Sequence, residues 1–164
     1  MGSESEMITT LRDDDREKIL LILVETNNFN FDEISIAMEL IDDYLNKEEQ
    51  SDYEIFVDRN EEDENLINGY VCIGQRPLTE STYDLYWIAV NPAIQSKGVG
   101  SRLVSYIEEH IKNKNGRLVL IETSGKPSYE KERKFYEKNL YTKLVEIKDF
   151  YKEADSLVIY GKYL

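Results

Sequence analysis

The sequence is poor in the residues that bind metals or cross-link chains. It has one cysteine, Cys72, and one histidine, His110, in 164 residues. A single cysteine forms no disulfide within the chain, which fits a reducing cytoplasm. One cysteine and one histidine are too few for an ordinary zinc site. We therefore expect a cytoplasmic protein without a metal centre.

Long apolar runs and an excess of basic residues are also missing. No stretch approaches the roughly 18 apolar residues of a membrane span. Residues 1–6 lack the basic start and apolar core of a signal peptide, and we expect them to form a disordered tail. With 33 acidic and 20 basic side chains the net charge is −13, which disfavours nucleic acid and anionic membranes as partners. A cationic partner would be attracted instead.

The remaining composition is globular, because 41% of the residues are hydrophobic and the length is sufficient to bury a core. The periodicity predicts one α/β (α+β) domain over residues 1–164, with about six to seven strands and about four helices. A strand–helix–strand unit near the middle predicts parallel pairing, and the run Leu118 to Ile121 predicts a strand buried on both faces. The expected strands are 7–11, 53–58, 66–75, 83–90, 118–121, 143–150 and 156–163; the expected helices are 16–25, 31–45, 98–113 and 127–139.

The strongest local signal is the segment from Val90 to Gly100, which has the sequence VNPAIQSKGVG. A predicted strand ends there, a short loop follows, and glycines open a helix. The first amides of a helix are unpaired and lie at the positive end of its dipole. Because Gly98 and Gly100 would let phosphates approach the backbone, the segment predicts a pyrophosphate site. Lys97 would add a positive charge at close range.

Other nucleotide-binding loops fit this segment less well. A P-loop requires Lys after its second glycine, where this chain has Val99 after Gly98. A dinucleotide-binding loop requires a third glycine, where this chain has Leu103. About 40 residues after Glu122 are also too few to complete that fold's sheet. A helix that begins with glycines by chance and binds nothing remains an alternative.

The pattern Val-x-Pro-x-x-Gln-x-x-Gly-x-Gly, matched here at every defined position, resembles the acetyl-CoA loop of the GNAT superfamily. The resemblance extends over residues 53–164 and includes Glu122-Thr123-Ser124, Phe135-Tyr136 and Asp149-Phe150-Tyr151 in that order. It implies a GNAT-type mixed sheet whose parallel fourth and fifth strands are splayed. It also implies an N-acetyltransferase in which a primary amine attacks the thioester of acetyl-CoA directly, without a metal.

The resemblance further implies roles for individual residues. Tyr136 matches the tyrosine that protonates the departing thiolate, and Asp84 lies where one branch of the family has a glutamate base. Glu122 is the second candidate base. Where the family usually has glycine four residues after that tyrosine, this chain has Leu140, so the helix end is expected to differ. The residues implied in acetyl-CoA binding are Ile88, Ala89, Val90, Gln95, Ser96, Lys97, Gly98, Val99, Gly100, Ser101, Tyr129, Arg133 and Tyr136.

Each of these roles has a structural alternative. Tyr136 is one of 12 tyrosines and could simply pack in the core, and Asp84 could be a solvated carboxylate at a strand end. The whole chain could be a non-catalytic acyl-CoA-binding or regulatory module, because a fold does not imply a function. The family's acceptors range from small amines and antibiotics to protein lysines and N-termini. The acceptor is therefore open between a small molecule and a protein, and a homodimer is compatible with the resemblance.

Overall fold

The computed structural model describes residues 7–47, 52–94 and 98–164. The predictions for residues 1–6 and for Gln95, Ser96 and Lys97 therefore lie outside the described residues. The fold divides into two compact units, one formed by Met1–Gly74 and Trp87–Ile107 and the other by Gln75–Tyr86 and Glu108–Leu164. In the described part of the chain, no helix has the length and apolar character needed to cross a membrane.

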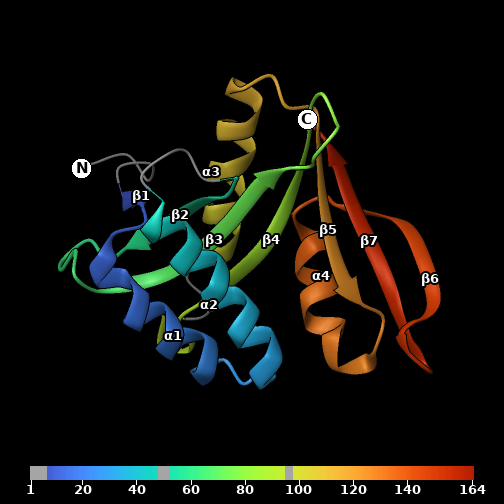
Figure 1. Cartoon of the computed structure of the whole chain (residues 1–164), viewed down its shortest axis with the longest axis horizontal. Helices are drawn as coiled ribbons and strands as arrows, with labels where there is room; N and C mark the ends of the chain where they lie inside the picture. Colours follow the sequence, from blue (N-terminus) through green and yellow to red (C-terminus); the bar gives the residue numbers. More distant parts are fainter. Residues whose placement is uncertain (1–6, 48–51, 95–97) are drawn as a thin grey trace. The chain divides into compact units, whose positions relative to one another are not determined.

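The predicted order of elements is confirmed (Figure 1). Seven strands form a mixed sheet in the order β1-β2-β3-β4-β5-β7-β6. Three short 3-10 helices, at Asp13–Asp15, Pro92–Ile94 and Pro127–Tyr129, accompany the main elements. The strands are β1 Ile8–Thr10, β2 Glu54–Arg59, β3 Ile67–Gln75, β4 Thr82–Val90, β5 Leu118–Ser124, β6 Thr142–Lys152 and β7 Asp155–Tyr163; the helices are α1 Arg16–Glu25, α2 Phe31–Asn46, α3 Val99–Asn113 and α4 Glu130–Lys138.

The parallel pairing expected of the strand–helix–strand unit joins β4 to β5. The ladder pairs Thr82 with Leu118, Tyr83 with Val119 and Asp84 with Leu120, and it lies in the second unit. These are the first three residues of each strand. Among the described residues of that unit no further β4–β5 pair follows, as the predicted splay of the two strands requires.

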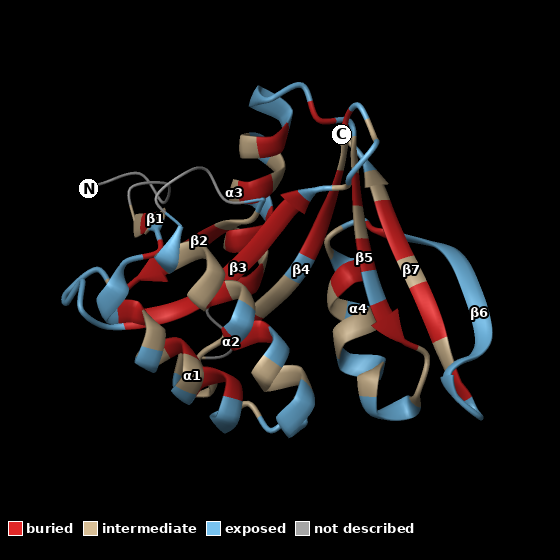
Figure 2. Ribbon diagram, in the orientation of Figure 1, coloured by how far each residue is buried: buried red, intermediate tan, exposed pale blue. Residues whose placement is uncertain are grey.

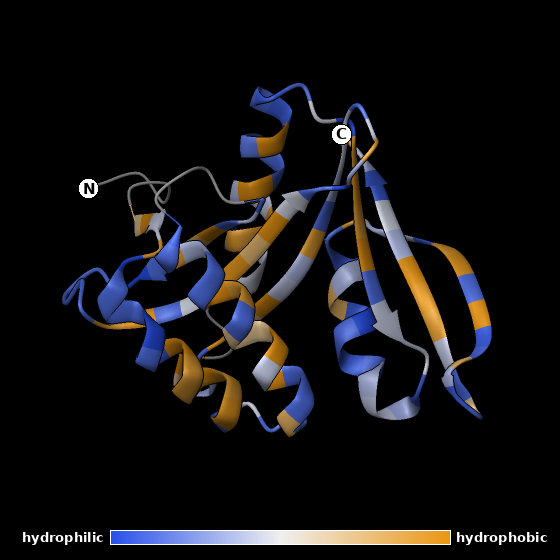
Figure 3. Ribbon diagram, viewed as in Figure 1, coloured by the Kyte–Doolittle hydropathy of each residue, from blue (hydrophilic) through white to orange (hydrophobic). Residues whose placement is uncertain are grey.

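The first unit has helices on both faces of its strands. Residues of α1 and α2 such as Ile19, Leu23 and Ile41 pack with Ile55 of β2 in one buried cluster, and Figure 3 shows the apolar residues along these elements. On the opposite face, Phe56 meets Tyr106 of α3 edge to face, with ring centroids 5.1 Å apart. Side chains alternate between the two faces of a strand, so consecutive β2 residues serve both layers.

Cys72 lies inside this core, as expected of a small apolar residue. It is 1% exposed, and burial raises the pKa of its thiol to about 12. The thiol is therefore both inaccessible and protonated at neutral pH.

Among the described residues of the first unit, two buried aspartates are paired with arginines. The Arg59 guanidinium binds both carboxylate oxygens of Asp15, at 2.9 and 2.7 Å, and the two side chains are 5% and 1% exposed. Asp58, which is fully buried, accepts from Arg102 at 2.6 and 3.1 Å. Such pairs compensate charges that would be costly to bury alone.

The second unit contains β5, β7, β6 and α4. The prediction that residues 118–121 are buried on both faces was wrong, because Val119 and Ile121 are buried while Leu118 and Leu120 are only half-buried. The outer strand β6 is exposed along all eleven of its residues (Figure 2).

The end of α4 explains how the chain manages without the glycine that the family usually has there. Leu140 adopts the left-handed conformation, with φ of +71°. Its amide donates to the Glu137 carbonyl at 3.0 Å, and the Tyr141 amide donates to the Tyr136 carbonyl at 3.0 Å. These two bonds form a Schellman motif, whose left-handed position favours glycine. A leucine there keeps the motif but carries the strain of its Cβ.

We expect Leu140→Gly to stabilise the protein by up to about 1 kcal/mol. The leucine side chain is 74% exposed, so little packing is lost when the strain is relieved. Leu140→Ala is the control, because alanine retains the Cβ that causes the strain. Urea unfolding of the three proteins tests this, and equal stability of the glycine and alanine variants would contradict it.

Candidate active site

The end of β4 is held closely to β3. A Cβ on Gly69 would lie 2.7 Å from the carbonyl oxygen of Ala89, so only glycine permits this approach. The Asn91 amide donates to the Asn68 carbonyl at 2.7 Å, and the Asn91 side chain accepts from the Ala93 amide at 3.0 Å. The loop that leaves β4 therefore starts from a fixed point.

The same loop ends at Gly98, a position whose backbone conformation favours glycine. Gly98 has φ of +72°, and among the described residues no atom beyond its chain neighbours lies within 4 Å of where a Cβ would stand. The Arg102 amide donates to the Gly98 carbonyl at 3.0 Å and closes the first turn of α3. By helix geometry the amides of residues 99 to 101 have no acceptor within the helix. This corner can therefore receive phosphate oxygens on backbone amides.

The charge around this corner suits an anion despite the acidic composition of the chain. The segment from Trp87 to Ile107 contains no acidic residue, and its basic residues are Lys97 and Arg102. Asp58 neutralises Arg102 and ties the first turn of α3 to β2. Asp58 also accepts from the side-chain Nδ2 of Asn68 at 2.8 Å, so one buried carboxylate holds both sides of the corner. Sequence analysis missed this role, although an acid inside the apolar run IFVDR was a usable signal.

Asp84 and Glu122, the two candidate bases, are brought together in the second unit. The Nη2 atom of Arg76 lies 2.8 Å from Asp84 Oδ1 and 3.3 Å from Glu122 Oε1. The Asp84 side chain is 8% exposed and that of Glu122 is 47% exposed. Asp84 is therefore not the solvated strand-end carboxylate of the alternative interpretation, and Glu122 is not buried with its strand.

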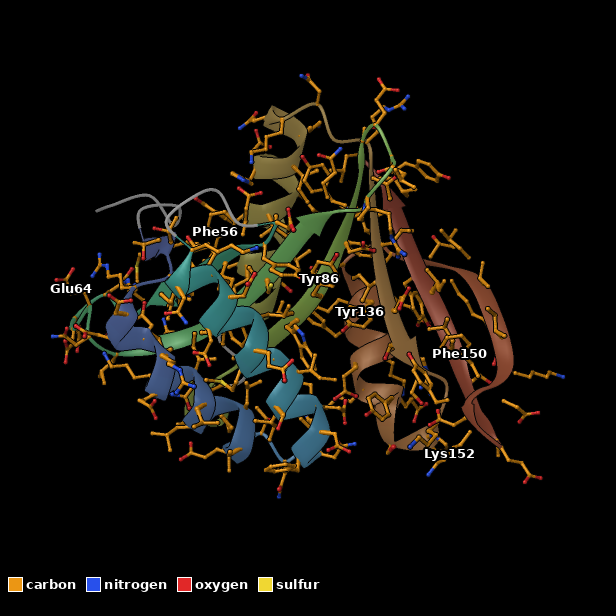
Figure 4. The ribbon with its side chains drawn as sticks, viewed as in Figure 1. Phe56, Glu64, Tyr86, Tyr136, Phe150 and Lys152 are labelled. Carbon is orange, nitrogen blue, oxygen red and sulfur yellow. The ribbon has the colours of Figure 1, made fainter. Side chains whose placement is uncertain are left out.

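Tyr136 lies on α4 and is buried (Figure 4). Its ring contacts those of Phe135 and Tyr160, with centroids 5.7 and 6.0 Å away. Burial, and next the charge of Glu132, raise the pKa of its phenol above the ordinary value. The raised pKa means that this hydroxyl keeps its proton at neutral pH.

Tyr129 and Arg133 flank the turn between β5 and α4. Arg133 donates from Nη1 to the carbonyls of Ser124 and Lys126, at 2.7 and 2.8 Å. The Lys126 ammonium lies 5.8 Å from the centre of the Tyr129 ring. Both residues thus shape this turn, and their contact with acetyl-CoA stays a prediction.

The predicted site residues are divided between the two units. Three of the residues on β4 lie near its end, where Ala89 is buried and Ile88 and Val90 are half-buried. The described members are Ile88, Ala89, Val90, Gly98, Val99, Gly100 and Ser101 in the first unit, and Asp84, Glu122, Tyr129, Arg133 and Tyr136 in the second.

The model of the acetyltransferase (GNAT) family matches residues 16–140. A crystal structure described as an acetyltransferase of the GNAT family from Desulfovibrio desulfuricans is 32% identical to the chain. It superposes with a TM-score of 0.87, and the match covers 95% of this chain and 97% of that one. No curated protein matches the sequence.

Two more distant structures show the same fold with a ligand bound. An aminoglycoside 6'-N-acetyltransferase complexed with coenzyme A is 14% identical, with a TM-score of 0.69 over 95% of this chain and 96% of that one. A structure described as a streptothricin acetyltransferase from Bacillus anthracis, in complex with acetyl coenzyme A, is 19% identical. Its TM-score is 0.63, over 75% of this chain and 67% of that one.

Proposed function

Because the chain belongs to the acetyltransferase (GNAT) family, we propose that it transfers an acetyl group from acetyl-CoA to a primary amine. The observation that carries this proposal is the corner at Gly98. A left-handed glycine, with open space beside it as far as the described residues go, leads directly into the first turn of α3, whose amides have no acceptor within the helix. A diphosphate is the group that such a corner binds best.

Separate groups of residues bind acetyl-CoA and donate the proton. The amides of Val99, Gly100 and Ser101, with Gln95, Ser96 and Lys97 before Gly98, hold the pyrophosphate of acetyl-CoA. The backbone of Ile88, Ala89 and Val90 lies along its pantetheine arm. Acetyl-CoA supplies the thioester, and Tyr136 donates a proton to the sulfur that leaves. A phenol suits this step because it holds its proton at neutral pH and can donate it to the sulfur as negative charge develops there.

The acceptor is a cationic amine, whether on a small molecule or on a protein. A primary amine with a pKa near 10 is an ammonium ion at neutral pH and must lose a proton before it attacks. Asp84 accepts that proton, directly or through water, with Glu122 beside it. The net charge of −13 favours the approach of a cation over long range.

We expect saturating acetyl-CoA to raise the melting temperature, because a ligand at 100 times its Kd adds about 2.7 kcal/mol of stability. Gly98→Ala should weaken binding at least about tenfold, since the left-handed backbone is strained with the Cβ of alanine. Asparagine tolerates that conformation, so Gly98→Asn should keep the melting temperature of the free protein. Its side chain would occupy the space through which phosphates approach, so this variant should lose the response to acetyl-CoA. A thermal shift series measures all three.

A normal response to acetyl-CoA in both variants would remove Gly98 from the site. No response in the unchanged protein at millimolar acetyl-CoA would remove the proposal itself. A panel of primary amines, assayed for acetylated product, separates the enzyme from a non-catalytic acyl-CoA-binding module. The module would give the thermal shift and no product with any amine.

A further inference from the structure

One nitrogen atom joins the two candidate bases of the second unit. Nη2 of Arg76 lies between a carboxylate oxygen of β4 and one of β5, 2.8 Å from Asp84 and 3.3 Å from Glu122. Arg76 itself comes from the turn between β3 and β4. Its amide donates to the Thr82 carbonyl at 2.8 Å, so the arginine starts from a fixed backbone position.

The register of the sheet explains why the two carboxylates meet. Asp84 is paired with Leu120 in the parallel ladder, and Glu122 lies two residues beyond Leu120. Residues two apart in a strand share a face, so Asp84 and Glu122 point to the same side of neighbouring strands. Two carboxylates in this position repel each other unless a cation lies between them.

The guanidinium is held by the carboxylates and by little else. Its Nε is buried and has no partner among the described residues, and the arginine side chain is 40% exposed. Here the contacts of Nη2 with Asp84 and Glu122 determine where the group lies.

The protonation of Asp84 depends on the same contacts. Burial is the largest influence and raises the pKa of this carboxyl above its ordinary value. The hydrogen bond and the charge of Arg76 lower this pKa, and so does the hydrogen bond from the Tyr86 hydroxyl, 3.5 Å away. The charge of Glu122 raises it. Arg76 is therefore the main group of this unit that favours the ionised carboxylate.

We propose that Arg76 is a positioning residue that keeps Asp84 ionised and Glu122 beside it, so that the carboxylate pair serves as the base for a cationic amine. This inference rests on the proposed acetyl transfer. In the step concerned, one proton moves from the ammonium nitrogen of the acceptor to a carboxylate oxygen of Asp84. The nitrogen keeps its electron pair for attack, and the neutral acid later returns the proton to water.

The test is the pH dependence of kcat/KM in Arg76→Gln and Arg76→Lys. Loss of the guanidinium raises the pKa of Asp84 further. As the solution is acidified, the Asp84 carboxylate is therefore protonated at a higher pH than in the unchanged enzyme and stops acting as a base. We expect the acidic limb of the Arg76→Gln profile to move to higher pH, with kcat/KM about tenfold below the unchanged enzyme on that limb. Arg76→Lys should recover most of this loss, because it restores the charge.

Arg117→Gln is the matched control. This arginine also binds beside β4, through Nε to Ser81 Oγ at 2.7 Å, but its side chain is 71% exposed and its carboxylate partner is Glu80. Its profile should coincide with that of the unchanged enzyme. Equal acidic limbs in Arg76→Gln and Arg117→Gln would overturn the proposal.

A second measurement does not depend on activity. The Asp84 carboxyl carbon can be titrated by NMR in the unliganded protein, with and without Arg76→Gln. A midpoint that moves to higher pH in the variant supports the coupling even if no amine is acetylated, in which case only the proposed function fails. A midpoint that does not move overturns the role of Arg76, whatever the enzyme does.

Discussion

Replacing Arg59 with methionine should lower the free energy of unfolding by about 3–5 kcal/mol. The substitution leaves the Asp15 carboxylate, 1% exposed, without its cation in the interior of the first unit. The cost arises from that isolated charge rather than from the lost contact. The double variant Asp15→Leu/Arg59→Met should therefore be more stable than Arg59→Met alone, because it buries no charge. Urea unfolding of the three proteins measures the difference.

Arg16→Met provides the comparison on the surface. Arg16 also binds both oxygens of an aspartate, Asp42, but these two side chains are 36% and 41% exposed. Water solvates the Asp42 carboxylate when Arg16 is removed, so the free energy of unfolding should fall much less than in Arg59→Met. Equal losses in Arg16→Met and Arg59→Met would show that burial does not decide the strength of these pairs.

The Arg59 pair also contributes to acid sensitivity. Burial raises the pKa of Asp15, but the hydrogen bonds from the Arg59 side chain and the Arg12 amide outweigh it and leave the pKa below its ordinary value. A carboxyl with a lowered pKa stabilises the fold above its unfolded pKa, near 4, and this contribution is lost as the pH falls through the folded value. Arg59→Met should therefore show a weaker loss of stability below about pH 4.

Tyr136→Phe should reduce kcat by at least about 100-fold while the KM for acetyl-CoA changes little. The ring remains to pack against Phe135 and Tyr160, and only the donated proton is lost. The departing thiolate must then take its proton from water, which is less well placed. Steady-state kinetics over a range of acetyl-CoA concentrations give both constants.

Tyr160→Phe is the control for this prediction. Its ring lies beside that of Tyr136, and its hydroxyl donates to Glu137 at 3.0 Å. Loss of that hydroxyl should alter stability slightly and leave kcat near that of the unchanged enzyme. If both variants lose the same activity, the effect comes from packing around α4, and Tyr136 has no special role.

The order of helices and strands could be predicted from the sequence better than the burial of each element. The order of strands and helices and the parallel β4–β5 pair follow from periodicity and from Pro92 and the glycines at the corner. The degree of burial does not follow, as β5 shows. A run such as Leu118–Ile121 indicates a strand, but whether both faces are covered depends on elements that come later in the chain. Leu118 and Leu120 are accordingly only half-buried.

The candidate site shows the same division. Gly98 could be found because a glycine before a helix is a local signal, and Leu140 could be noted because it replaces an expected glycine. Arg76 could not be found in this way. Its contacts join residues 8 and 46 positions apart, and the contact with Glu122 exists only because the parallel register places Asp84 beside Leu120. The register between β4 and β5 cannot be deduced from the spacing of residues in the sequence.

The burial of Cys72 has a practical consequence for kinetic measurements of acetyl transfer. Acetyl transfer releases coenzyme A, whose free sulfhydryl group can be counted with a colour-forming disulfide reagent. The chain's own sulfhydryl, 1% exposed and with a pKa of about 12, should not react with that reagent while the protein is folded. Colour in the absence of an acceptor would then report unfolding or hydrolysis, and the enzyme can be used at high concentration without a background of its own.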